Sequence, residues 1–196
     1  MLFELRTYDL EVGKAVHYLE FFRDKGMAMI TRHLPMAGYW MTESGGLNRI
    51  HHLWVYADFA ERSAYRAAAA ADAEWNGIFV PEAFPLIVSQ KNAFLELDEG
   101  SPLLKSVVKA RLTHHRQKDA ARPLFSERWF SLIARSRAGI AASDGERIGL
   151  WHVRSGHNVG AAIEIRAAAT PEMLLGADPS AVGHELMRPC ALSPLR

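Results

Sequence analysis

Residues 47–56, LNRIHHLWVY, are rich in β-branched and aromatic side chains and follow the pair Gly45-Gly46. A run of such residues predicts a strand, and the two glycines predict a hairpin turn before it. Successive side chains of a strand point to opposite faces. One face carries Ile50, His52, Trp54 and Tyr56, and the other carries His51, Leu53 and Val55. We expect Leu53 and Val55 to face helices, and the face with the rings to meet a ligand or a second sheet.

Similar patterns predict the other elements of the first half of the chain. Period-two alternation indicates strands, and apolar stripes or alanine-rich runs indicate helices. The predicted strands are residues 2–8, 39–43 and 86–95, and the predicted helices are residues 15–33 and 61–71, the second continuing towards residue 79. The resulting order is βαββαβ, the ferredoxin-like split βαβ unit. In that unit two helices cover one face of the sheet and leave the other face bare.

The same plan recurs more faintly in the second half. Residues 98–102, DEGSP, predict a linker. Beyond it the patterns predict a strand at 107–113, a helix at 120–142, strands around 149–152 and 163–165, a helix beginning at Thr170-Pro171, and either a terminal strand or a tail at 189–194. We interpret this as an internal duplication, and shared architecture alone is the alternative. The predicted α+β fold is two tandem ferredoxin-like units, residues 1–98 and 105–196.

Composition narrows the class of protein. The 196 residues carry a net charge of +1, so no charge excess indicates a nucleic acid or a membrane surface as a partner. The single cysteine, Cys190, excludes a disulfide within the chain and a cysteine-based zinc site. The start MLFELR lacks the apolar core of a signal peptide, and no apolar run reaches transmembrane length. We therefore expect a cytoplasmic protein.

The face with the rings also carries polar groups from the first strand. By strand parity it holds Glu4, Arg6, Tyr8, His52, Trp54 and Tyr56, with Trp40 or its neighbours. Such a patch is costly to expose to water, so we expect two sheets to pack face to face as a barrel. The two sheets come from one chain or from two, and we expect a homo-oligomer assembled through sheet faces. Glu4 and Arg6 are expected to pair.

Three stretches resemble the NIPSNAP family: ELRTY at 4–8, GYWMTESG at 38–45 and LNRIHHLWVY at 47–56. AER at 60–62, Trp75 and SQKN at 89–92 continue the match, which covers residues 1–97. The resemblance implies the dimeric α+β barrel fold and assembly as a dimer or larger. The family has no settled enzymatic activity. Distant relatives of that fold include cofactor-independent monooxygenases, haem-degrading enzymes and isomerase-like or dehydratase-like proteins.

The second half departs from the family pattern. Ala162, Glu164 and Arg166 stand where His52, Trp54 and Tyr56 stand in the first half. We therefore expect one site per chain, with the second half serving mainly to cover it.

The candidate chemistry is acid–base rather than metal-dependent. His51 and His52 point to opposite faces and no third ligand accompanies them, so we predict no metal and no cofactor. We expect a small organic ligand, His52 as proton acceptor and Arg6 as the holder of an enolate or carboxylate. The residues expected to line the ligand site are Glu4, Tyr8, Trp40, Trp54 and Tyr56. The predicted chemistry is cofactor-independent monooxygenation or isomerisation. The alternatives are a satisfied polar network and a non-catalytic interaction module.

Overall fold

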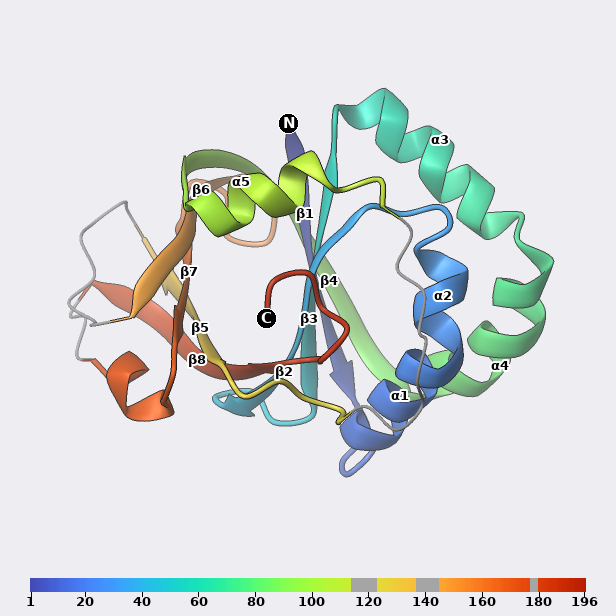
Figure 1. The fold of residues 1–196 in the computed structure, drawn as a ribbon, viewed down its shortest axis with the longest axis horizontal. Helices are drawn as coiled ribbons and strands as arrows, with labels where there is room; N and C mark the ends of the chain where they lie inside the picture. The colour runs from blue at the N-terminus through green and yellow to red at the C-terminus, as the bar shows by residue number, and fades with distance from the viewer. Residues whose placement is uncertain (114–122, 137–144, 177–179) are drawn as a thin grey trace.

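Strands from both halves of the chain close one barrel in the computed structural model, which describes residues 1–113, 123–136, 145–176 and 180–196 (Figure 1). All neighbouring strands are antiparallel. The order around the barrel is β1 (Leu2–Leu10), β3 (Arg49–Tyr56), β2 (Met36–Ser44), β8 (Ala181–Pro189), β5 (Trp129–Arg135), β7 (Ala162–Ala168), β6 (Glu146–Gly156) and β4 (Ile87–Gly100). The two sheets therefore pack against each other within one chain. Assembly with further chains stays a prediction.

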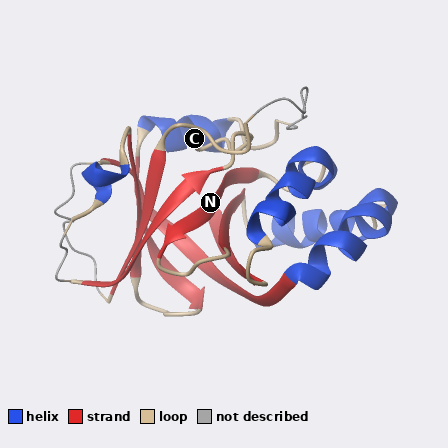
Figure 2. Cartoon of the chain, turned by 90° about the horizontal axis from the view of Figure 1, so that it is seen from below, coloured by secondary structure: helices blue, strands red, loops and turns tan. Residues whose placement is uncertain are grey.

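The first half has the predicted βαββαβ order. Between β1 and β2 lie α1 (Ala15–Phe21), the π-helical η1 (Phe22–Gly26) and α2 (Met27–Ile30), and between β3 and β4 lie α3 (Phe59–Ala70), η2 (Trp75–Phe79), α4 (Val80–Ala83) and η3 (Phe84–Leu86). α3 begins where the Asp58 side chain accepts a hydrogen bond from the Glu61 backbone N–H at 2.8 Å, an N-cap that fixes its start. Figure 2 shows these helices together on one side of the barrel.

The second half corrects three sequence predictions. Residues 107–109, predicted to start a strand, belong to α5 (Pro102–Lys109), because Ser101 caps its first turn and accepts from the Leu104 N–H at 3.1 Å. The predicted linker is accordingly the end of β4 followed directly by this cap. Residues 129–135, predicted as helix, form β5. Residues 120–122 and 137–142 of that predicted helix lie outside the described residues.

Other predictions for the second half are confirmed. β6 and β7 contain the strands expected around residues 149–152 and 163–165, and a short 3₁₀ helix, η4 (Pro171–Leu174), follows Thr170. Residues 190–196 continue past β8 without a strand. The strand order β8-β5-β7-β6 repeats the order β4-β1-β3-β2 of the first half. In each half, the fourth strand along the chain is followed in the barrel by the first, the third and the second. The duplication and the division at residues 98 and 105 stay predictions.

The two faces of the first-half sheet are the reverse of the prediction. Leu53 and Val55 point into the barrel and pack with apolar residues of the second half, such as Ile163. Trp54 and Tyr56 instead lie beneath the helices. The physical reason is that this face carries the buried Glu4 carboxylate, and α3 supplies Arg62 and Arg66 as its charged partners.

One end of the barrel is closed by α5 and the C-terminal residues (Figures 1 and 2). Leu104 of α5 and Leu195 are fully buried in the interior cluster, and the Leu195 N–H donates to the Ala37 carbonyl at 3.1 Å. Across the described residues, no helix has the length and apolar character needed to cross a membrane.

Candidate functional site

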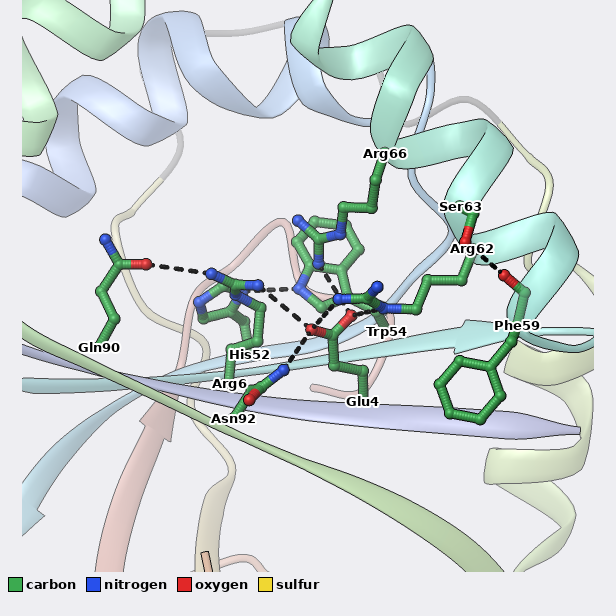
Figure 3. A network of polar contacts seen from close by, with 10 residues as sticks. All are labelled: Glu4, Arg6, His52, Trp54, Phe59, Arg62, Ser63, Arg66, Gln90 and Asn92. Atoms are coloured by element: carbon green, nitrogen blue, oxygen red, sulfur yellow. Dashed lines mark hydrogen bonds and ion pairs between the residues drawn. The ribbon is translucent and has the colours of Figure 1, made fainter. Parts of the chain in front are cut away.

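A buried carboxylate, Glu4 of β1, anchors the polar network beneath α3 (Figure 3). Arg62 donates to both of its oxygens, at 2.9 and 3.0 Å, and Arg66 donates at 3.1 Å. Arg6 donates at 3.2 Å and Asn92 at 3.1 Å. Burial raises the pKa of Glu4, but the hydrogen bond from Arg62 and the charge of Arg66, with Asn92 and Arg6, lower it to about 2. Three guanidinium groups around one ionised carboxylate leave the site positive.

His52 lies beside this network as a neutral ring. The Trp54 indole N–H donates to Nδ1 of His52 at 2.7 Å. An indole nitrogen only donates, so Nδ1 accepts and the ring proton resides on Nε2. Burial, together with the charges of Arg6 and Arg66, holds the pKa of His52 well below its usual value. Nε2 is buried and has no hydrogen-bond partner among the described residues.

This tautomer argues against the proton-acceptor role expected for His52. Accepting a proton at Nε2 requires the other tautomer, whose Nδ1–H would confront the Trp54 N–H. A neutral ring with an available Nε2–H is instead a hydrogen-bond donor.

A cavity of about 310 Å³ lies between this face of the sheet and the helices. Its wall is largely aromatic, and the Tyr8 and Tyr39 rings flank His52 at centroid distances of 4.6 and 5.1 Å. The lining includes Arg6, Tyr8, Tyr18, Phe22, Tyr39, His52, Trp54, Arg66, Trp75 and Gln90. Nε of Arg6 and Nε of Arg66 are, like Nε2 of His52, buried donors without a partner among the described residues. Three unpaired N–H groups thus belong to residues that line one cavity.

The structure brings together most of the residues singled out from sequence. Arg6, Tyr8, His52 and Trp54 line the cavity, and Glu4 supports it from below through the expected pair with Arg6. Tyr56 shares their face but does not line the cavity, and burial raises its pKa to about 12.

Trp40 is misplaced by the prediction. It lies inside the barrel, with its ring centroid 5.8 Å from that of Phe130, whereas its neighbour Tyr39 lines the cavity. A register shift between Met36 and Gly38 accompanies this placement in β2, and strand periodicity alone does not reveal such a shift.

Sequence reasoning assigned no role to Arg62, Arg66, Gln90 or Asn92. Arg62 and Arg66 are four residues apart on α3, a spacing that places two side chains on one face of a helix. That spacing was an available signal. Their common partner, Glu4, gave no such signal, because it is 58 residues from Arg62 in the chain. Within the described part of the chain, no group of three or more His, Cys, Asp or Glu side chains is arranged to hold a metal ion.

The depressed pKa of Glu4 predicts acid sensitivity. The folded pKa is about 2 against an ordinary 4.5, so the contribution of Glu4 to stability is complete above pH 4.5 and lost as the pH falls through 2. It is on the order of 3 kcal/mol. Urea unfolding measures the free energy of unfolding of the wild type and of Glu4→Gln. We expect the difference between the two proteins to be smaller at about pH 3 than at about pH 6. If both proteins lost the same stability between the two pH values, Glu4 would not be the source of the acid sensitivity.

A family model described as NIPSNAP matches residues 3–102. The chain belongs to the NIPSNAP family. The matched region runs from β1 to the start of α5, and so contains every residue of the cavity wall and of the Glu4 network.

Two curated NIPSNAP relatives each match less than half of the chain. NipSnap homolog 3B of Mus musculus is 43% identical over 79 residues, which are 40% of this chain and 32% of that protein. NipSnap homolog 3A of Homo sapiens is 37% identical over 93 residues, which are 47% of this chain and 37% of that protein. The chain therefore spans about a third of the length of these relatives.

Solved structures confirm the dimeric α+β barrel class. A NIPSNAP family protein of unknown function from Agrobacterium tumefaciens is 33% identical, covers 52% of this chain and 92% of its own, and has a TM-score of 0.50. An anthrone oxidase-like protein, 7% identical, covers 96% of this chain and 90% of its own with a TM-score of 0.54. A candidate monooxygenase from Fusobacterium nucleatum is 9% identical and covers 97% of this chain and 92% of its own, with the same TM-score of 0.54. At such low identities these two structures show the fold alone.

Proposed function

We propose that this NIPSNAP protein binds a small, planar organic anion in the cavity between the helices and the first-half sheet. The observation that supports this most is the set of unpaired donors, His52 Nε2–H with Arg6 and Arg66 Nε–H, beside an aromatic wall. Unpaired buried donors are costly, and an anionic oxygen that reached them would relieve that cost. A volume of about 310 Å³ suits a ligand of two or three fused rings at most.

The cavity differs in position from the one expected from sequence. The sequence placed the ligand inside the barrel, whereas these residues face the helices. The ligand would therefore enter beside α3 and η2, whose Arg66 and Trp75 contribute to the wall.

Cofactor-independent oxygenation or isomerisation through an enolate is the second candidate function. Its support is that a neutral His52 donor and the Arg6 guanidinium both suit an enolate oxygen, since fixed donors and positive charge stabilise an oxyanion. An electron-rich enolate would itself supply the electrons for reaction with O₂. The name of the anthrone oxidase-like protein suggests anthrone as a first substrate to test.

Binding is tested by quenching of tryptophan fluorescence, because Trp54 and Trp75 line the cavity. The probe is 2-naphthoate, and neutral 2-naphthamide is its matched ligand. We expect the acid to bind more tightly than the amide, and His52→Ala to weaken binding of the acid by about tenfold or more. His152→Ala is the control variant, because His152 is on β6 and pairs with Asp98 instead.

The proposal is wrong if the acid and the amide bind equally tightly, or if His52→Ala binds the acid as tightly as the wild type does. Oxygen consumption with anthrone, in the wild type and in His52→Ala, tests the second candidate separately. If no probe binds and the protein instead forms assemblies, the alternative of a non-catalytic interaction module gains support.

A further inference from the structure

The opposite face of the same strands carries a second polar cluster that the proposed ligand site does not use. Thr7 of β1 pairs in register with His51 of β3 on one side and with Lys91 of β4 on the other. All three line a cavity of about 230 Å³ at the barrel end away from α5. Thr7 follows Leu5 on the barrel face of β1, so this cavity lies on the other side of the sheet from His52 and Arg6.

A carboxylate from the second half completes the cluster. Glu185 of β8 lies 2.6 Å from Nε2 of His51 and accepts from Arg49 at 2.6 Å. Burial raises the pKa of Glu185, but the hydrogen bond from His51 and the hydrogen bond and charge of Arg49 lower it to about 2. An ionised carboxylate only accepts, so Nε2 of His51 carries a proton and donates.

The other nitrogen of His51 is then the acceptor in the neutral ring. It lies 3.0 Å from the Thr7 hydroxyl, which donates to it. Hydroxyl, imidazole and carboxylate thus stand in the order found in nucleophilic triads, with the two ring nitrogens exchanging places. A purely structural staple between the barrel halves needs only Glu185, Arg49 and His51. The contact with Thr7 carries the chain of hydrogen bonds to a residue that lines the cavity.

We propose that Thr7 is a nucleophile for acyl transfer from a small activated carboxylic ester bound at this end of the barrel. Its Oγ forms a bond to the carbonyl carbon, and its proton passes to Nδ1 of His51. The ester C–O bond then breaks, and His51 returns the proton to the departing oxygen. Water cleaves the acyl-threonine by the reverse proton path and releases the carboxylic acid.

The surroundings of Thr7 fit this step. The Lys91 ammonium, on the neighbouring strand in register with Thr7, supplies positive charge for the tetrahedral oxyanion. Ala134, Ala161 and Ile163 of the second half form an apolar wall. The cavity volume of about 230 Å³ restricts the acyl group to a short one.

The experiment uses two probes, p-nitrophenyl acetate and diisopropyl fluorophosphate. We expect peptide mass spectrometry of the folded wild-type protein to find the acetyl or phosphoryl group on Thr7. Thr7→Val should abolish this adduct and lower p-nitrophenol release by about tenfold or more, and His51→Gln should slow labelling of Thr7 similarly. Ser89→Ala is the control, because it removes a hydroxyl at the same barrel end that bonds Asp9 rather than His51.

Absence of an adduct on Thr7 in the wild type would overturn the proposal without any variant. Equal p-nitrophenol release by wild type and Thr7→Val would do the same. Binding of 2-naphthoate by Thr7→Val should remain unchanged, because Thr7 lies on the other face of the sheet. The two sites therefore fail or succeed independently.

Discussion

Replacing Glu4 by glutamine is expected to lower the free energy of unfolding by about 3–5 kcal/mol. The carboxylate is fully buried and holds Arg6, Arg62 and Arg66. Removing its charge leaves three guanidinium groups close together with no anion between them, and a buried charge without its partner is costly. Glutamine keeps the shape of the side chain, so the loss reports on the charge. Urea unfolding at neutral pH measures it.

Glu96→Gln is the matched control for this change. Glu96 pairs with Arg154 at 3.3 Å, but both side chains are more than half exposed, at 62% and 68%. An exposed pair contributes little, so we expect a change below about 1 kcal/mol. A loss below about 1 kcal/mol for Glu4→Gln as well would show that the arginines are solvated despite the burial of Glu4.

Phe79→Ala is expected to lower the free energy of unfolding by about 3–5 kcal/mol. Phe79 is fully buried at the junction of η2 with α1 and η1. Its ring stacks on Trp75 at 4.4 Å and on Phe21 at 5.4 Å, and meets Tyr18 and Phe22 edge-on at 5.9 and 5.8 Å. Truncation removes these contacts and leaves a cavity that the surrounding rings cannot fill.

The matched control is Phe59→Ala. Among the residues that the structure describes, Phe59 has one aromatic contact, with Phe94 at 4.9 Å, and it is 54% exposed. Its truncation should cost about 1 kcal/mol, because little area is lost and no cavity forms. Thermal or urea unfolding of both variants gives the comparison. If the two variants lost similar free energies of unfolding, the packing of the first-half helices would contribute little to the stability of the fold.

The first half was predictable because its local signals agree. Periodicity, the turn at Gly45-Gly46 and the cap at Asp58 all favour the elements that the structure contains. In the second half the signals conflict. The alternation at 107–113 favoured a strand, whereas Ser101 and Pro102 begin a helix there, and the cap and helical packing prevail. Apolar residues at 129–135 suited either period, and pairing with β7 and β8 decides for a strand.

The sequence by itself determined which side chains share a face. Strand parity grouped Glu4, Arg6, Tyr8, His52 and Trp54, and the structure keeps that group together beneath the helices. Parity is relative, however, and does not say which face looks into the barrel. Closure of the sheet with β8 and β6 decided that, by giving Leu53 and Val55 the interior.

The partners from distant segments were likewise decided by tertiary structure alone. Arg62 and Arg66 reach Glu4 only because α3 packs over the sheet beside β3, and Glu185 reaches His51 across 134 residues of chain. Such contacts depend on which elements pack together, and local side-chain patterns carry no information about packing between distant segments. The sequence therefore specified the chemical groups, and the closed barrel specified the two cavities in which they meet.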